Sequence, residues 1–191
     1  MNKGKLIVIA APSGSGKTSI VKKLIQDDTL KLRFSISATT RKARKNETNG
    51  KDYYFINKNQ FKELIEKDEL IEWEEVYENQ YYGTLFQEVE RIRKQNQNVV
   101  FDIDVNGALS IKKKFGESCL SIFIKTPNLE TLKQRLESRK TEDKETLEKR
   151  LNKAKWELSK STCFDSIFIN DDLNQTVDHV KNKIQEFLDQ E

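Results

Sequence analysis

Short apolar runs alternate with segments of helical periodicity along most of the chain. Residues 5–10 (KLIVIA), 99–103 (VVFDI), 120–124 (LSIFI) and 166–169 (SIFI) are mostly apolar without alternation, which is typical of strands buried on both faces. Between these runs, apolar residues recur every three or four positions and predict helices. Strands and helices alternating in this way predict an α/β fold, in which a parallel core sheet is flanked by helices.

Each predicted helix carries one apolar stripe. The stripes are Ile20, Val21, Leu24 and Ile25; residues 109–115; Leu129, Leu132 and Leu136; Leu147, Leu151, Ala154 and Leu158; and Val177, Val180, Ile184, Phe187 and Leu188. Trp156 lies on the fourth of these helices, and we expect it to pack that helix onto the core.

Two stretches interrupt this alternation. Residues 34–84 hold short aromatic segments at 53–56 and 70–77 around one helix near 61–65, which predicts a small insertion that contains its own sheet. Residues 138–149 (SRKTEDKETLEK) are almost purely charged. That second stretch is either a solvated loop or a mobile lid, and the pattern leaves both interpretations open.

Composition excludes several classes of protein. The 191 residues carry 34 Lys plus Arg against 31 Asp plus Glu, a balance too even for a nucleic-acid or membrane-surface protein. The longest apolar run, residues 6–12, is far shorter than the roughly 18 residues that span a bilayer, and it continues into a motif, so we expect no secretory leader. Cys119 and Cys163 form neither a disulfide framework nor a metal-ligand pair, which favours a reducing, cytoplasmic location.

A phosphate-binding loop follows the first predicted strand. Its residues match the pattern G-x-x-x-x-G-K-[ST] except at the first position, and they are Ala11, Pro12, Ser13, Gly14, Ser15, Gly16, Lys17 and Thr18. Small residues let the backbone N–H groups surround a phosphate at the start of a helix. Lys17 would reach the outer phosphates and Thr18 would ligate Mg²⁺. A plain Gly/Ser turn is the alternative, but the strand and helix on either side favour binding of a nucleoside triphosphate.

Two acidic residues end the predicted strand at 99–103. Strand alternation puts Asp102 and Asp104 on one face, about 7 Å apart. The carboxyl ends of parallel strands are where α/β sheets bind ligands, so Asp102 is a candidate for holding Mg²⁺ or its water shell. For Asp104 the alternative is a simpler role, capping the helix that follows.

Several further motifs lie in order within and after the insertion. They are residues 37–47 (SATTRKARKNE), 49–53 (NGKDY), 71–73 (IEW), 81–84 (YYGT) and 170–172 (NDD). Together with the phosphate loop and residues 102–104 (DID), this set closely resembles guanylate kinase, in the nucleoside monophosphate kinase branch of the P-loop NTPases. The resemblance covers nearly the whole chain.

The resemblance implies a reaction and a domain organisation. The γ-phosphoryl group of ATP would pass to GMP or dGMP with Mg²⁺, giving ADP and GDP in purine metabolism, with no nucleic-acid or membrane partner. Residues 1–33, 85–125 and 159–191 would form the core with the phosphate loop, residues 34–84 the GMP-binding part, and residues 126–158 a helical lid.

The resemblance also implies roles for individual residues. GMP would be held by Ser37, Arg41, Arg44, Glu47, Tyr53, Glu72, Tyr82, Thr84 and Asp104. Catalysis would use Lys17, Arg41, Arg135, Arg139 and Arg150, and ATP would also contact Arg135, Arg139 and Asn170. Arginine and phenol groups donate hydrogen bonds to a phosphate, and a carboxylate such as Glu72 accepts from the adjacent N1–H and N2–H₂ of guanine, which adenine lacks.

The sequence departs from the family pattern at two positions, and two other functions remain as alternatives. Ala43 stands where the family usually has proline, and Lys140 where it usually has glycine. One alternative is a non-catalytic guanylate-kinase-like interaction module, against which the intact Gly16, Lys17 and Thr18 speak. The other is a kinase for a different nucleoside monophosphate or a sugar phosphate. Glu72 and the nearby hydroxyls favour guanine over that alternative, although Glu72 could also be one charge of an exposed edge strand.

Overall fold

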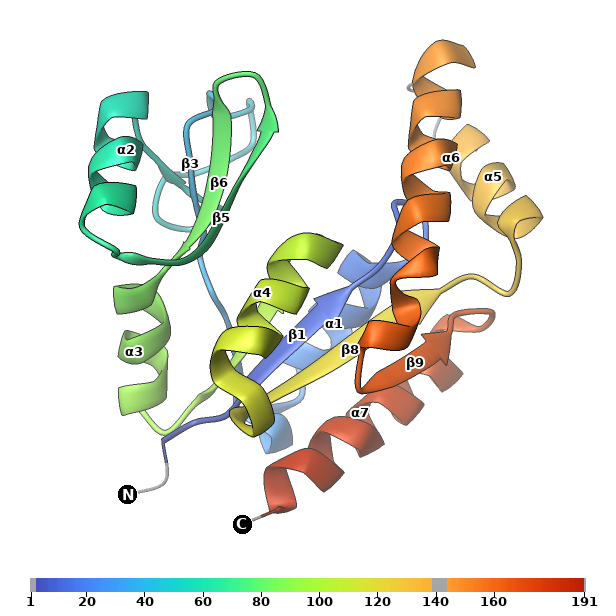
Figure 1. Cartoon of the computed structure of the whole chain (residues 1–191). Coiled ribbons are helices and arrows are strands. Elements are labelled where there is room, and N and C mark those ends of the chain that lie inside the picture. Colours follow the sequence, from blue (N-terminus) through green and yellow to red (C-terminus); the bar gives the residue numbers. More distant parts are fainter. Residues whose placement is uncertain (1–2, 139–143, 191) are drawn as a thin grey trace. The chain divides into compact units, whose positions relative to one another are not determined.

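The computed structural model describes residues 3–138 and 144–190, and the chain divides into two compact units (Figure 1). The small unit comprises Met1–Lys5 and Arg33–Val99, and the large unit comprises Leu6–Leu32 and Val100–Glu191. The three-part division into core, insertion and lid stays a prediction.

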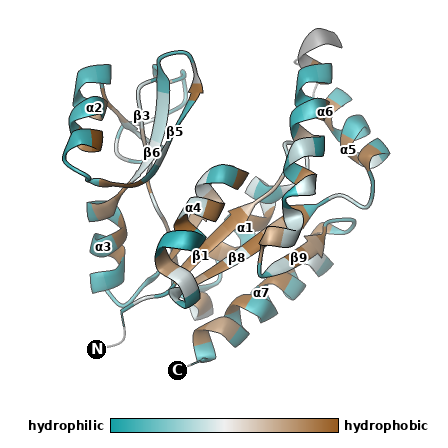
Figure 2. Cartoon of the chain, viewed as in Figure 1, coloured by the Kyte–Doolittle hydropathy of each residue, from teal (hydrophilic) through white to brown (hydrophobic). Residues whose placement is uncertain are grey.

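The core sheet is parallel and carries the apolar runs of the sequence. Its strands are β1 (Leu6–Ala10), β2 (Leu32–Phe34), β7 (Asn98–Asp102), β8 (Cys119–Lys125) and β9 (Ser166–Ile169), in the order β2-β7-β1-β8-β9. β1 pairs in parallel with β8, and β8 with β9. Every residue of β1 is fully buried, and Figure 2 shows β1 and β8 as the apolar centre of the unit. The predicted parallel α/β core is confirmed.

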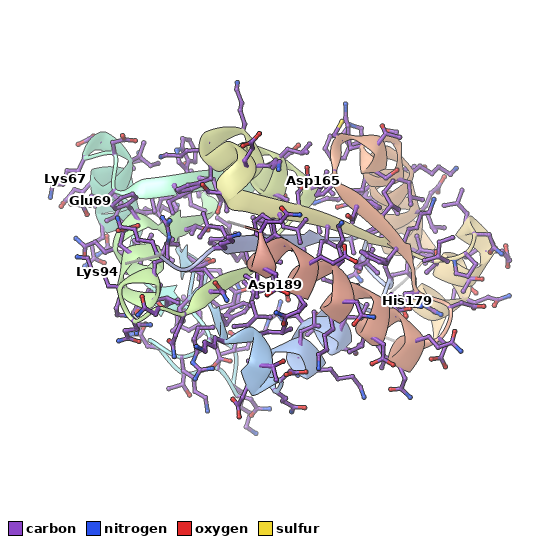
Figure 3. All side chains as sticks on the ribbon, turned by 90° about the horizontal axis from the view of Figure 1, so that it is seen from below. Lys67, Glu69, Lys94, Asp165, His179 and Asp189 are labelled. Atoms are coloured by element: carbon purple, nitrogen blue, oxygen red, sulfur yellow. The ribbon has the colours of Figure 1, made fainter. Side chains whose placement is uncertain are left out.

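Helices α1 (Lys17–Ile25), α4 (Val105–Phe115) and α7 (Leu173–Asp189) cover the two faces of this sheet. The large unit also contains α5 (Leu129–Glu137), α6 (Lys144–Ser159) and the short 3₁₀ turns η1 (Asp28–Leu30), η2 (Gly116–Ser118) and η3 (Ser161–Cys163). α4 packs on β1 and β8, whereas α1 packs on β1 and against α7. Figure 3 shows α4 on one side of the strands and α1 and α7 on the other, with the exposed His179 on α7.

Three of these helices begin at a side-chain cap. Asp104, Asn128 and Asp172 precede α4, α5 and α7, and each accepts a hydrogen bond from the N–H three residues later. Such caps satisfy N–H groups that a helix cannot bond internally, so they fix where these helices start.

α5 and α6 pack on each other through a separate apolar cluster. Leu132, Leu136 and Ala154 are buried in it, and Leu147 and Leu151 pack against them. Trp156 does not take part as expected, because 42% of it is exposed and Lys160 Nζ lies 5.9 Å from its ring centroid. The prediction that Trp156 packs its helix onto the core is therefore wrong.

The small unit has a mixed sheet of its own. Its strands are β3 (Ala38–Thr39), β4 (Tyr54–Phe55), β5 (Leu70–Tyr77) and β6 (Gln80–Leu85), in the order β4-β3-β6-β5, with helices α2 (Lys58–Glu66) and α3 (Phe86–Lys94). β3 runs parallel to β4 and antiparallel to β6. The predicted sheet-containing insertion is confirmed, although β3, β6 and α3 were not predicted.

The core of the small unit is built around Phe61. Its ring is fully buried with Ala38 and Leu70, and Tyr54, Leu64 and further apolar side chains pack against this cluster. A Cβ atom at Gly83 would lie 3.0 Å from the Phe61 ring and 3.1 Å from the Glu72 carbonyl oxygen. A side chain at this position would have to displace these neighbours by a few tenths of an ångström, so glycine suits the close approach of β6.

No helix within residues 3–138 and 144–190 combines the length and the apolar character that crossing a bilayer requires.

Candidate active site

The phosphate loop is shaped by two glycines between β1 and α1. Gly14 and Gly16 adopt φ angles of 91° and 89°, a region that favours glycine. The Ser15 N–H donates to the Pro12 carbonyl oxygen at 3.1 Å, which closes the turn. Gly16 is the N-cap of α1, and no side chain caps that helix in the described structure. The first N–H groups of α1 therefore point to a place where an anion would be stabilised.

Lys17 is held at the mouth of this loop by the end of β7. Its Nζ forms an ion pair with the Asp102 carboxylate and donates to the Ile103 carbonyl oxygen at 2.7 Å. The side chains of Lys17 and Asp102 are 18% and 20% exposed, so the pair is shielded yet reachable. The structure thus brings together two of the residues predicted for phosphate and metal binding.

Asn170 supports the loop from beneath. It follows β9, is buried, and its Nδ2 donates to the Ser15 carbonyl oxygen at 2.7 Å. A Cβ atom at Gly16 would lie 2.2 Å from this Nδ2, so the close approach requires glycine. The Asn170 Oδ1 and Ser15 Oγ atoms are buried without a hydrogen-bond partner in the described structure. The predicted contact of Asn170 with ATP stays a prediction, and the observed contact is with the loop.

Helix α5 lies against the same loop. A Cβ atom at Gly14 would lie 3.2 Å from Leu136 and 3.3 Å from Leu132. Arg135, on α5, donates from Nη1 to the Asn170 carbonyl oxygen at 3.1 Å. Arg135 therefore stands beside the loop, and its guanidinium is already bonded to backbone.

Two more arginines, Arg139 and Arg150, were predicted to act on the ATP phosphates together with Arg135. Arg150 lies on α6 and is half-buried. Arg139 lies outside the described residues, as does Lys140. Their proposed action on ATP stays a prediction.

Asp104 has the capping role that competed with guanine recognition. Its Oδ1 accepts a hydrogen bond from the Gly107 N–H at 2.8 Å at the start of α4. Asp104 belongs to the large unit, whereas the other predicted GMP-binding residues all belong to the small unit. Its contact with guanine stays a prediction.

Glu157 is a buried carboxylate that the sequence analysis missed. It lies on α6 with only 6% exposed, and this burial raises its pKa to about 7. Lys153 and Lys17 lower that pKa in part, while Asp104 raises it. The available signal was its spacing, because position 157 follows the buried Ala154 by three residues and therefore lies on the same apolar face.

The residues at this loop fit a magnesium ion bound together with a triphosphate. Thr18 is exposed at the start of α1 and Asp102 is partly exposed, so both offer oxygen ligands. No group of three or more His, Cys, Asp or Glu side chains that could hold a metal occurs in the described residues. Mg²⁺ suits such a sparse set, because it usually takes one or two protein oxygens and completes its shell with water and phosphate.

Arg41 is the centre of the site in the small unit. Its Nη1 and Nη2 donate to the two Glu47 carboxylate oxygens at 2.6 and 2.7 Å, and its Nε donates to the Tyr82 hydroxyl at 3.1 Å. Its guanidinium carbon lies 5.0 Å from the centroid of the Tyr53 ring. The structure therefore gathers four of the residues predicted to bind GMP: Arg41, Glu47, Tyr53 and Tyr82.

The pairing of Arg41 with Glu47 shifts both ionisations. The Arg41 hydrogen bonds hold the pKa of Glu47 down at about 2, and the Glu47 hydrogen bonds raise the pKa of Arg41 far above its usual range. Both groups stay charged at neutral pH. Arg44 is exposed three residues further along the same loop.

Glu72 and Thr84 meet across the hairpin of β5 and β6. They are directly opposite in register, and the Thr84 hydroxyl donates to Glu72 Oε1 at 2.5 Å. Thr84 is fully buried and Glu72 is half-buried. The Thr84 hydroxyl, which was expected to donate to guanine, donates to the Glu72 carboxylate in this structure.

Ser37 lies before β3 and is half-buried. Its carbonyl oxygen accepts from the Tyr54 N–H at 2.9 Å.

Comparison with known proteins gives consistent matches over the whole chain. The family described as guanylate kinase matches residues 3–187. The guanylate kinase of Porphyromonas gingivalis is 48% identical over 96% of this chain and 98% of its own length. That of Bacteroides thetaiotaomicron is 45% identical over 98% of this chain and 92% of its own length. The crystal structure of guanylate kinase from Anaplasma phagocytophilum is 29% identical, with a TM-score of 0.78 over 100% of this chain and 89% of that chain.

Proposed function

The chain belongs to the guanylate kinase family, and we infer that it is a catalytic GMP kinase that transfers the γ-phosphoryl group of ATP to GMP, giving ADP and GDP. One observation carries this conclusion. The family match spans the phosphate loop, in which Gly14 and Gly16 adopt positive φ and Lys17 is positioned at the mouth by Asp102. A non-catalytic interaction module has no need of that geometry and is not favoured.

The donor side would be the phosphate loop of the large unit. Its backbone N–H groups and the start of α1 would hold the ATP phosphates, and Lys17 would leave Asp102 partly to reach the outer ones. Asp102 and Thr18 would then be free to hold Mg²⁺. When bound, Mg²⁺ supplies positive charge at the phosphates, where negative charge spreads during transfer. Arg135 and Arg150, with Arg139, would contribute on the same side.

The acceptor side would be the site around Arg41 in the small unit. Arg41, Arg44, Tyr53 and Tyr82 supply hydrogen-bond donors, which suit a phosphate dianion. A phosphate monoester has its second pKa near about 6, so GMP is already largely dianionic at neutral pH. We therefore propose that no general base is needed, and that the chain's task is to align two anions and neutralise their charge.

Guanine would be selected by the pair of Glu72 and Thr84. The Thr84 hydroxyl fixes one Glu72 oxygen, which aligns the carboxylate so that it can accept from guanine N1–H and N2–H₂. Adenine presents an acceptor at N1, so the same carboxylate would repel it. A buried polar site of this kind discriminates strongly because the wrong base leaves its groups unpaired.

We place this reaction in the cytoplasm. Cys119 and Cys163 are both free thiols, which is typical of proteins in reducing compartments. ATP and GMP, the substrates of the proposed reaction, are the partners that the two sites suit.

A panel of nucleoside monophosphates tests the proposal directly. The protein is mixed with ATP and Mg²⁺, each monophosphate is added in turn, and ADP release is followed with a coupled assay. We expect rapid turnover with GMP or dGMP, and turnover lower by about 10⁴ or more in kcat/KM with AMP. Equal turnover with AMP or a sugar phosphate would point to another kinase, and no turnover with any acceptor would restore the non-catalytic interpretation.

A further inference from the structure

Arg41 is bonded more completely than a phosphate-binding arginine needs to be. Besides Glu47 and Tyr82, its Nη1 also donates to the Lys42 carbonyl oxygen at 2.9 Å. A guanidinium has five N–H groups. Among the described residues the Nε–H, both Nη1–H groups and one Nη2–H of Arg41 are engaged, which leaves one. Its two-pronged edge, the geometry that binds an anion bidentately, is occupied by Glu47.

Glu47 is itself fixed by the backbone. Its Oε2 accepts the Arg44 N–H at 2.8 Å, while its own N–H donates to the Arg44 carbonyl oxygen at 3.0 Å. The carboxylate therefore closes a tight turn of residues 44–47 and grips Arg41 from that turn. Its low pKa keeps it ionised at every pH at which the enzyme would work.

Aromatic rings fix the remaining freedom of the Arg41 side chain. The Tyr53 and Phe55 ring centroids lie 5.0 and 5.6 Å from its guanidinium carbon, and the Tyr53 and Tyr82 rings meet edge to face at 5.9 Å. The Tyr82 oxygen accepts from Arg41 Nε. A phenol that accepts in this way still has its own O–H to donate.

We propose that Glu47 is a positioning residue of the acceptor site: it clamps Arg41 by its two-pronged edge, so that one Arg41 N–H and the Tyr82 hydroxyl face the GMP phosphate, and bidentate binding falls to Arg44. This inference rests on the proposed function. It assigns Glu47 no direct contact with the nucleotide, which also removes the difficulty of placing a carboxylate against a phosphate dianion. The competing possibility is that Glu47 is a stand-in anion that GMP displaces.

Substitution of Glu47 separates the two possibilities. Glu47→Gln removes the charge and one of the two acceptors on Arg41, and we expect the KM for GMP to rise about tenfold, as for one charge-assisted hydrogen bond. The KM for ATP and kcat should stay within about twofold. A stand-in anion predicts the reverse, a lower KM for GMP. Either that result or an unchanged KM would overturn the clamp.

Two controls confine the effect to Arg41. Glu63→Gln removes a carboxylate from an exposed pair with Lys67 on α2, and it should leave every constant unchanged. In an Arg41→Ala background, Glu47→Gln should raise the KM for GMP no further, because its action passes through Arg41. A full additional rise in that background would contradict the clamp.

A direct measurement on the unsubstituted protein distinguishes a Glu47 clamp from a stand-in anion, and it needs no activity assay. Nitrogen-15 NMR of the arginine side chains should show a slowly exchanging Arg41 Nε–H signal. Titration with inorganic phosphate should shift the Arg44 signal and leave that of Arg41 sharp. Loss of the Arg41 signal on phosphate addition would show displacement and reject the clamp. Because this readout needs no turnover, a protein that fails to phosphorylate GMP would refute the proposed function and still leave the clamp tested.

Discussion

Each of the two units offers a proposed phosphate site, and the two sites are built from different chemical groups. In the large unit the anion site is made of backbone: N–H groups at the start of α1, two glycines in positive φ, and one lysine beside them. In the small unit it is made of side chains, with Arg41 held by Glu47, Tyr82 and the Tyr53 ring. Each unit keeps its cation next to a carboxylate, Asp102 or Glu47.

The difference lies in how firmly each cation is held. Lys17 is a flexible point charge with one carboxylate and one carbonyl as partners, so its ammonium can turn from Asp102 to an incoming phosphate. The Arg41 guanidinium is planar, and its Nε, Nη1 and Nη2 groups all donate hydrogen bonds. The proposed donor site can therefore adapt around its ligand, whereas the proposed acceptor site is organised before a ligand arrives.

Removal of Lys17 gives the largest expected effect and tests whether the two sites are separable. Lys17→Met keeps the length of the side chain and removes its charge, so kcat should fall by about 10³, as when a group that stabilises transition-state charge is lost. The affinity for GMP, measured by calorimetry without ATP, should stay within about twofold. An equal loss of GMP affinity would show that the two sites are not independent.

The dependence of folding stability on pH should differ between a carboxylate of the large unit, Glu157, and one of the small unit, Glu47. The pKa of Glu157 is raised from the usual 4.5 to about 7, so between these values the folded chain binds a proton that the unfolded chain does not. The free energy of unfolding should therefore fall as pH rises from 5 to 8, on the order of 3 kcal/mol from this group at 1.36 kcal/mol per pKa unit. Urea unfolding at several pH values should show this slope in the unsubstituted protein and a flatter one in Glu157→Gln.

Glu47 should act in the opposite direction and in another pH range. Its pKa is lowered to about 2, so it stabilises the fold above about pH 4.5 and loses that contribution as pH falls toward 2. The outcome that would contradict the Glu157 prediction is a stability that rises from pH 5 to pH 8 to the same extent in the unsubstituted protein and in Glu157→Gln. Such a result would show that burial does not raise the pKa of Glu157.

How far the sequence predicts each site follows from the same contrast. The phosphate loop motif is eight consecutive residues that run from the end of β1 into the first turn of α1, so its backbone geometry could be inferred from spacing alone. The strand β9 was predicted at 166–169, where it lies, because short apolar runs favour strands. It is not buried on both faces as expected, since Ile167 and Ile169 are exposed.

Contacts between distant side chains could not be predicted in the same way. The bond between Thr84 and Glu72 depends on the register of β5 against β6, which shifts between Leu70 and Glu72. Asn170 reaches the Ser15 carbonyl oxygen across 155 positions of sequence. The family resemblance implied that these groups bind nucleotides, which stays a prediction, and it gave no sign of the contacts that they make within the chain.

Guanine selection tests the pre-organised side of the comparison. Glu72→Gln keeps the shape of the side chain but presents an amide to the guanine donors, so the ratio of kcat/KM for GMP over AMP should fall about 100-fold. Thr84 would lose its charged acceptor in the same variant. Glu63→Gln on α2 serves as the matched control. Unchanged rejection of AMP would remove Glu72 from the proposed recognition of the base.

The smallest expected effect concerns Arg44, the exposed arginine of the acceptor loop. Arg44→Lys replaces a two-pronged donor with a point charge, so the KM for GMP should rise about tenfold while that for ATP stays unchanged. Arg33→Lys, at an exposed arginine of β2 outside the proposed sites, should change neither. If Glu47 clamps Arg41 and Arg44 binds the phosphate bidentately, Arg44→Lys should also raise the KM for GMP in a Glu47→Gln background. Equal rises in both Michaelis constants would mean that the two units do not divide the nucleotides between them.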